Sequence, residues 1–323
     1  MEDLFETGTV TAPDPKQTRR AASLCAFAAV FAIVLTYTIL FGITLLLNRA
    51  KLSDRAYDNL IMIVNTVVID GVALPLAWLL LLRRTPIVEP PEAGSVRSPL
   101  SFRVFFFYFP CAFVLMYGGA LLGRLIGMLF GKELSDVVDS AIGSVDVWVT
   151  VLCAGIAAPI AEELFFRKAM IDRLSGHHPT DAILYSALLF ALIHGNLTQF
   201  LYAFPLGVLF GFVYYRTRNV GHTILLHVGI NLLGGVVPQL VSMIDSEGEG
   251  FSSLASTLVM VLYSGVTIVL CVFGIIHLVR YRKQYFPIRT ALPRFRRPFY
   301  LNAGFIVACV IFTGLFVLNE IVA

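Results

Sequence analysis

The chain has 323 residues, of which 58% are hydrophobic and 14% carry a charge, and its mean hydropathy is +0.82. Soluble proteins carry about 25% charged residues, so this composition excludes a water-soluble enzyme, a disordered chain and a disulfide scaffold. The net charge of +3 gives no indication of a nucleic-acid partner, and none is expected. The composition predicts an all-α, polytopic membrane protein.

Nine apolar runs follow one another along the chain, and a helix needs about 20 such residues to cross the hydrocarbon core. The candidate spans are about 21–47, 57–82, 103–130, 146–171, 181–197, 199–215, 221–243, 253–279 and 299–320. The two runs around residue 197 are short and are separated only by His194, Gly195 and Asn196. The sequence therefore predicts eight or nine transmembrane helices.

The polar N-terminal segment does not resemble a signal peptide, because the apolar run after it is longer than the roughly 7–15 residues of a signal core. We expect a cytoplasmic polar tail over residues 1–20. Residues 21–323 are expected to form a single multi-span membrane domain, because no linker is long enough to hold a soluble domain.

Lysine and arginine are distributed unevenly between the two sides of this topology. With the N-terminus in the cytoplasm, 19 of the 24 basic residues fall on the cytoplasmic side and four fall outside, while Arg124 lies within the third span. The positive-inside rule therefore predicts a cytoplasmic N-terminus. The short loops favour a bacterial plasma membrane, with lipids as neighbours of every span.

Ionisable residues inside the spans are few, and each costs on the order of 3 kcal/mol to insert, which makes them candidates for function. They are Asp70, Arg124, Glu162, Glu163, Arg167, His194, His227, His277 and Glu320. The sequence assigns no role to Arg124 or Glu320. Asp70 can either serve a site or pair with Arg124.

The fourth span carries two adjacent carboxylates in the segment AEELFFR. Glu163 lies one helical turn before Arg167, so these two side chains are predicted to pair. Glu162 lies about 100° round the helix and has no partner on its own helix. One paired and one free carboxylate are typical of an orienting group beside a general base. The alternative is a helix end at which Arg167 reaches toward the headgroups.

Two further spans carry polar pairs at helical spacing. Phe190 and His194 are four residues apart, as are His227 and Asn231, so each pair projects from one face of its helix. Either pair can be structural, as a helix stop or as an interhelical hydrogen bond. Together with Glu162 they supply a base, imidazoles and an amide, which are the groups that peptide hydrolysis requires.

The three motifs together resemble a known family of membrane proteases. EExxxR (Glu162, Glu163, Arg167), FxxxH (Phe190, His194) and HxxxN (His227, Asn231) resemble the signature of the CPBP family, which joins CAAX proteases with bacteriocin-processing enzymes and includes the type II CAAX prenyl endopeptidases. The motifs lie within a protease-like core at about 148–240.

The resemblance implies an intramembrane endopeptidase whose cavity opens towards the cytoplasmic side. It implies that Glu162 and His194 activate a water molecule and that His227 and Asn231 stabilise the oxyanion. Supporting roles would fall to Glu163, Arg167 and Phe190. The substrate would be a peptide or protein, lipidated or not, and the sequence gives no indication of oligomeric state.

Metal dependence is left open, because Glu162, His194 and His227 form a His₂Glu set of the kind that zinc accepts. The family resemblance is compatible with both a metalloprotease and a metal-free glutamate mechanism. Two other function classes also remain. A transporter or channel could use the buried polar residues as an ion path, although no inverted repeat supports it. A catalytically silent scaffold could share the protease fold.

Overall fold

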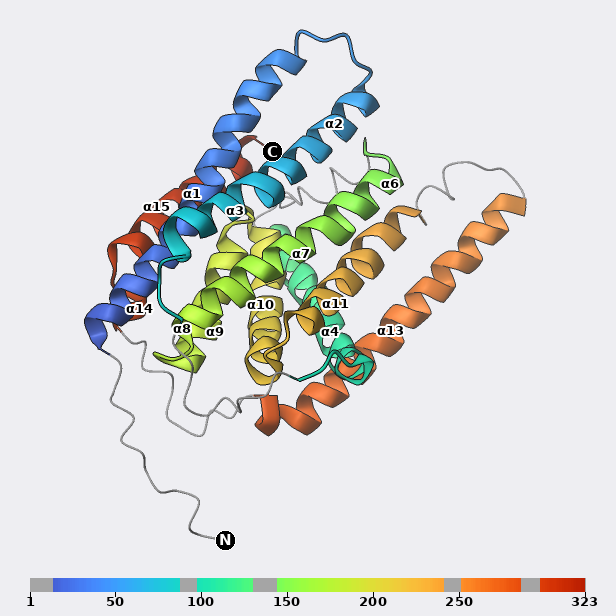
Figure 1. Ribbon diagram of the computed structural model, residues 1–323. Coiled ribbons are helices and arrows are strands. Elements are labelled where there is room, and N and C mark those ends of the chain that lie inside the picture. Colours follow the sequence, from blue (N-terminus) through green and yellow to red (C-terminus); the bar gives the residue numbers. More distant parts are fainter. Residues whose placement is uncertain (1–13, 88–97, 130–143, 241–250, 286–296, 323) are drawn as a thin grey trace.

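The computed structural model describes residues 14–87, 98–129, 144–240, 251–285 and 297–322 (Figure 1). These residues form helices and turns and contain no β-strand, which confirms the predicted all-α class. Seven of the helices in the described part of the chain are long and apolar enough to cross a membrane. The protein is therefore a multi-pass membrane protein.

The helical elements are named in chain order, and η marks the π-helical stretches. They are α1 (Pro15–Leu47), α2 (Asp54–Thr66), η1 (Val67–Ala73), α3 (Leu74–Ala77), η2 (Trp78–Leu82), α4 (Phe102–Leu129), α6 (Val147–Thr150), η3 (Val151–Ala157), α7 (Ala158–Glu162), η4 (Glu163–Ile171), α8 (Asp172–Leu174), α9 (Pro179–Leu192), α10 (Leu197–Thr217), α11 (Val220–Asn231), η5 (Leu232–Val236), α13 (Phe251–Tyr285), α14 (Arg297–Tyr300) and α15 (Ala303–Val322). Elements that directly adjoin form continuous helices over Asp54–Leu82, Val147–Leu174 and Val220–Leu240.

The predicted count of eight or nine spans is too high for the described helices. The fifth predicted span is α9, which has only 14 residues. At 1.5 Å per residue it is about 21 Å long, which is shorter than the hydrocarbon core of about 30 Å. The apolar part of α15, Ala303–Asn319, is also short of a full span. The sixth predicted span is α10, which has 21 residues and is long enough.

The first helix begins earlier than the sequence suggested. Of the predicted tail over residues 1–20, residues 1–13 lie outside the described part of the chain, and the rest belongs to α1 from Pro15 onwards. Asp14 accepts a hydrogen bond from the Lys16 amide over 3.0 Å, and Pro15 occupies the first helical position. Both features favour a helix start at this point, because they satisfy or remove unpaired amide groups.

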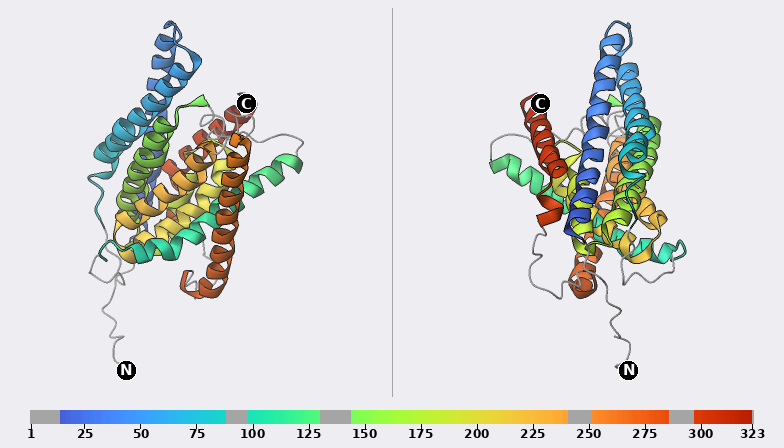
Figure 2. Two further views of the ribbon diagram at one scale, coloured as in Figure 1. Left: turned by 90° about the vertical axis from the view of Figure 1, so that its right-hand side faces the viewer. Right: turned by 60° about the vertical axis from the view of Figure 1, so that its left-hand side comes forward.

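The helices pack as a bundle whose two ends differ in charge. One end, called the basic end, carries the helix termini Leu82, Phe102, Leu174, Thr217 and Val220 with Arg83, Arg84, Arg103, Arg173 and Arg216 around them. The opposite end carries the helix termini Leu47, Asp54, Leu129 and Val147. Figures 1 and 2 show the α1–α2 turn at the top of the bundle and the last turns of α13 at the bottom.

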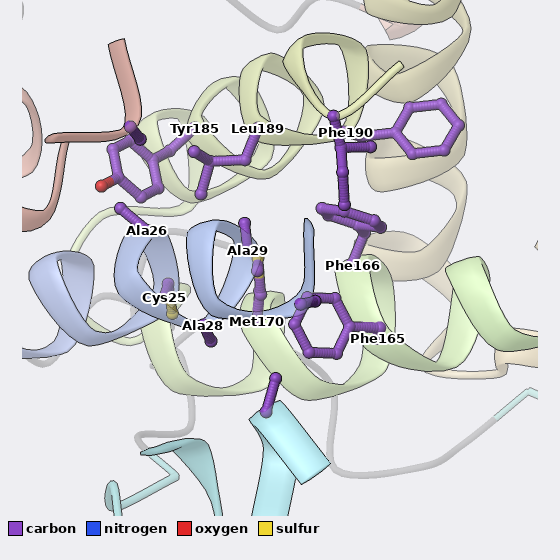
Figure 3. Close-up of a cluster of buried hydrophobic side chains, with 14 of the residues drawn as sticks. Cys25, Ala26, Ala28, Ala29, Phe165, Phe166, Met170, Tyr185, Leu189 and Phe190 are labelled. Atoms are coloured by element: carbon purple, nitrogen blue, oxygen red, sulfur yellow. The ribbon is translucent and has the colours of Figure 1, made fainter. Parts of the chain in front are cut away.

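A stripe of small side chains on α1 forms one wall of the core. Cys25, Ala26, Ala28 and Ala29 are fully buried against the Val147–Leu174 helix and α9 (Figure 3). Small residues allow helix backbones to approach closely, which is how helices associate inside a membrane. A second close approach joins α4 to α10, where a Cβ atom on Gly119 would lie 2.6 Å from Cα of Tyr202. These contacts hold the site-bearing helices in place.

Proline shapes the helix that carries the two glutamates. Pro159 cannot donate to the carbonyl four residues earlier, and its ring would collide with that carbonyl in an α-helix. The chain avoids the collision by the wider π-helical stretch η3, in which the Ala158 amide donates to the Cys153 carbonyl. A π-helix turns less per residue than an α-helix. The direction of Glu162 therefore depends on a distortion that ideal helical spacing does not describe.

Candidate active site

The four residues predicted to be catalytic line one cavity. Its volume is about 1360 Å³, and Glu162, His194, His227 and Asn231 all contribute to its wall. Glu162 ends α7, His194 lies in the turn between α9 and α10, and the other two side chains project from α11. Three segments that are distant in the sequence thus meet at a single place, although their roles in catalysis stay predictions.

Glu163 and Arg167 form a fully buried ion pair next to this cavity. Nε of Arg167 lies 3.1 Å from Oε2 of Glu163, and both side chains have no exposed surface. The guanidinium also lies over the Phe190 ring, 4.2 Å from its centroid, where the ring face attracts the cation. The predicted pairing is confirmed. Removing either partner would leave an uncompensated charge in the core.

His227 connects the two glutamates. Its Nδ1 atom lies 2.9 Å from Oε1 of Glu163, and its Nε2 atom lies 3.6 Å from Oε2 of Glu162. Because a carboxylate only accepts hydrogen bonds, Nδ1 of His227 carries a proton and donates a hydrogen bond to Glu163. Glu162 has no partner on its own helix, as expected, but it does have a neighbour on α11. The Glu162 side chain is 20% exposed, and it lies on the cavity wall.

Hydrogen bonds to main-chain carbonyls orient the other two polar side chains. Nδ1 of His194 donates to the carbonyl of Phe190 over 2.7 Å, so in the neutral ring Nε2 is the unprotonated nitrogen. Nδ2 of Asn231 donates to the carbonyl of Ala154 over 2.8 Å. The Phe190 ring packs edge-on against both His194 and His227, with centroids 4.9 Å and 5.8 Å away. Phe190 therefore separates and supports the two imidazoles.

The candidate zinc ligands do not form a three-ligand centre. Glu162 and His227 are close enough to share an ion, but among the described residues no three His, Cys, Asp or Glu side chains are arranged to hold one together. A catalytic zinc site keeps three protein ligands and one open position. The donor set of this cavity does not fit that pattern.

Two ionisable residues that the sequence left without a role also reach the cavity. Asp70 of η1 and Arg124 of α4 both line it, and no ion pair joins them in the described structure. The Asp70 carboxyl is close enough to Glu162 for the two groups to interact electrostatically. Its position as the only acidic residue in the apolar part of the second span was the available signal. The side chain of Glu320 lies outside the described residues.

The cavity extends towards the end of the bundle that is opposite to the basic end. Thr150 and Met128, which line it, lie within one turn of the helix termini Val147 and Leu129. The lining residues nearest to the basic end are Phe210 and His227, each about two helical turns from the end of its helix. The described lining therefore reaches closer to the opposite end than to the basic end.

Comparison with known proteins finds a family model that covers this site. A family model described as type II CAAX prenyl endopeptidase Rce1-like matches residues 144–233. The match covers all three motifs and most of the expected core at about 148–240, and it confirms the resemblance that the motifs indicated. No solved structure was found that matches the chain.

Related bacterial proteins cover different shares of the chain. UPF0177 protein YbdI of Lactococcus lactis subsp. lactis (strain IL1403) is 36% identical over 87 residues, which are 27% of this chain and 47% of that protein. The protein named "Putative membrane peptidase YdiL" of Bacillus subtilis (strain 168) is 24% identical over 210 residues, 62% of this chain and 82% of that protein. The chain thus spans about half of the first relative and most of the second.

Proposed function

We propose that this protein is an intramembrane endopeptidase, a hydrolase that cuts peptide bonds inside the cavity formed by α7, the α9–α10 turn and α11. One observation carries the proposal: a carboxylate, two imidazoles and an amide from three separate segments converge on a single cavity. The family match over residues 144–233 and the name of the Bacillus subtilis relative support the same activity.

Glu162 is the general base in this proposal. A water molecule between the Glu162 carboxylate and Nε2 of His194 would give one proton to Glu162 while its oxygen attacks the peptide carbonyl carbon. Nε2 of His194 accepts the hydrogen bond of the second water proton, because its Nδ1 proton is held by Phe190. A base must lie within hydrogen-bond reach of the proton that it takes. The protonated Glu162 then returns the proton to the leaving amine.

His227 and Asn231 stabilise the oxyanion. Glu163, which is paired with Arg167, accepts a hydrogen bond from Nδ1 of His227 and so fixes the orientation of the ring. In this proposal Nε2 of His227, the nitrogen that faces Glu162, donates a hydrogen bond to the oxyanion. The Asn231 amide has two N–H groups, and the one held by Ala154 orients the other. Donors aimed at developing negative charge are worth about 10²–10³ in kcat each.

Substitution of Glu162 tests this proposal. Purified protein in detergent is incubated with prenylated and unprenylated peptides, and cleavage products are identified by mass spectrometry. Glu162→Gln keeps the size of the side chain and removes the base, so turnover should fall about 10²-fold or more. Asp172→Asn is the control, because Asp172 is a carboxylate of the same helix that pairs with Lys168 near the basic end. This control should cleave normally.

Two results would count against this proposal, one against the role of Glu162 and one against a protease. Full activity of Glu162→Gln would exclude Glu162 as the base. If neither the wild type nor the control cleaved any peptide, whether prenylated or not, the transporter or the silent scaffold would become the better account.

A further inference from the structure

The second span, Asp54–Leu82, contributes to the cavity although it lies outside the residues that the family model matches. Asp70 of η1 lines the same cavity as Glu162. The segment η1 packs directly against α7, which Glu162 ends. Among the charged neighbours of Glu162, Asp70 acts on it most strongly, ahead of Glu163 and Arg167. The cavity therefore holds a further carboxyl group within electrostatic reach of the proposed base.

Polar contacts at both ends hold the second span against the helix that carries the two glutamates. Near the opposite end, Nδ2 of Asn59 donates to Oδ2 of Asp146 over 2.7 Å, and the Asp146 amide donates to Oδ1 of Asn59 over 2.8 Å. At the basic end, Nε of Arg173 donates to the carbonyl of Leu82 over 2.7 Å. These contacts keep the two helices from sliding past each other. The place of Asp70 in the cavity is therefore fixed.

One oxygen of the Asp70 carboxylate is left without a hydrogen bond. Its Oδ2 atom is buried and has no hydrogen-bond partner among the described residues. The neighbours in the chain, Ile69 and Gly71, have no side-chain donor. An unpaired buried acceptor is costly, and in a native structure it calls for an explanation. A hydrogen-bond donor on the substrate would provide one.

The helix that carries Glu162 lies between the second span and α11. It contacts η1 as well as α11, and Figure 1 shows α3, α7 and α11 in this order across the bundle. His227 and Asn231, the donors assigned to the oxyanion, project from α11. Asp70 belongs to η1. Glu162 therefore has hydrogen-bond donors on one flank and a carboxylate on the other.

A trans peptide bond matches this arrangement. Its C=O and N–H bonds lie in one plane and point in opposite directions. When the carbonyl oxygen of the bond to be cut faces the donors on α11, its N–H group faces η1. A carboxylate is an acceptor for such an N–H group. It would hold the nitrogen beside Glu162, which has to protonate that nitrogen.

We propose that Asp70 is a further catalytic residue of this cavity, an acceptor that binds the N–H group of the peptide bond to be cut. This role rests on the proposed peptidase function. It is a property of this chain's second span, since the family match begins at residue 144.

The contribution of Asp70 belongs to the second half of the reaction. After the attack of water, Glu162 holds one proton and the former carbonyl oxygen is an anion. Glu162 gives its proton to the nitrogen. The C–N bond then breaks with its electron pair on the nitrogen, the oxyanion becomes the carbonyl of the acid product, and a neutral amine leaves. Before the bond breaks, the nitrogen is positively charged, and the Asp70 carboxylate stabilises this charge.

An ester in place of the peptide bond tests this role. The probe is a peptide that the wild type cleaves, prepared once with the amide and once with an ester oxygen in place of the N–H group at the cut. The ester has no N–H group and forms no positive nitrogen, so Asp70 has nothing to bind, whereas Glu162 must still activate the water. Both kcat and KM are measured for each substrate with the purified full-length protein in detergent.

Asp70→Ala should lower kcat for the amide about 10²-fold and leave kcat for the ester within about threefold of the wild type. Asp70→Asn keeps an uncharged acceptor of the same shape, so its loss on the amide should be smaller, about tenfold. This variant also tests the role if the alanine variant fails to fold. Asp58→Asn is the matched control, because Asp58 is an acidic residue of the same span that does not line the cavity. It should cleave both substrates normally.

Two results would overturn the role of Asp70 alone. If Asp70→Ala lost amide and ester cleavage equally, the side chain would act through Glu162 or through packing. If it cleaved the amide normally, Asp70 would take no part in the reaction. In both cases, loss of both substrates in Glu162→Gln would leave the peptidase in place. A wild type that cleaved no peptide would refute the peptidase, and the role of Asp70 with it.

Discussion

Nδ1 of His227 donates a hydrogen bond to Oε1 of Glu163 over 2.9 Å, and both side chains are buried. The two residues are 64 positions apart, so this contact joins α11 to the Val147–Leu174 helix. It directs the other ring nitrogen of His227 towards Glu162. A carboxylate in this position holds an imidazole in one tautomer and one orientation. Glu163 is therefore a positioning residue for His227.

The two nitrogens of His227 should have separable roles. His227→Asn places an amide donor near the position of Nδ1, so it keeps the contact with Glu163 but removes Nε2. We expect kcat to fall about 10²-fold or more, while the thermal unfolding midpoint in detergent stays close to that of the wild type. Normal kcat in this variant would show that Nε2 takes no part in the reaction.

The Glu163–Arg167 pair should contribute to stability rather than to chemistry. Arg167→Ala leaves Glu163 buried without its cation, which costs about 3–5 kcal/mol of unfolding free energy. Arg167→Lys keeps the positive charge but lacks the planar group over Phe190. The loss of unfolding free energy should therefore be smaller in this variant than in Arg167→Ala. Denaturant unfolding of both variants measures their unfolding free energies and so tests this order of stability. An alanine variant as stable as the wild type would contradict the role of the pair.

Asn231 should matter for turnover more than a hydrogen-bonded amide that lies outside the cavity. Asn231→Ala removes an oxyanion donor, and we expect a loss of about 10²–10³ in kcat with little change in KM. Gln239→Ala is the control, because Gln239 also donates to a main-chain carbonyl, over 2.9 Å, but does not line the cavity. Steady-state kinetics of both variants compare them. Equal losses would mean that Asn231 acts only through packing.

Metal chelation separates the two mechanisms that the sequence left open. Because the described donors do not form a three-ligand site, we expect cleavage to continue after treatment with 1,10-phenanthroline and dialysis. Zinc content is measured by mass spectrometry alongside activity. Loss of cleavage that is restored by added zinc would replace the general-base mechanism with a metal-bound hydroxide.

The sequence by itself determined the class of the protein and much of its site. Composition excluded a soluble fold, and the apolar runs located most of the spans. The spacing of Glu163 and Arg167 predicted their ion pair, because side chains one turn apart on a helix are neighbours in any tertiary structure. The motifs nominated the cavity-lining residues Glu162, His194 and His227, and the family match covers the same segment.

Only the tertiary structure decided how these residues are combined. Neither the neighbour of Glu162 on α11 nor the place of Asp70 in the same cavity follows from local spacing. The reason is physical: periodicity describes neighbours within one turn, whereas contacts between helices depend on their depth, tilt and rotation. Those are set by packing, by small residues such as Gly119 and by the π-helical stretch before Pro159. The end of the bundle towards which the cavity extends is likewise a property of the assembled helices.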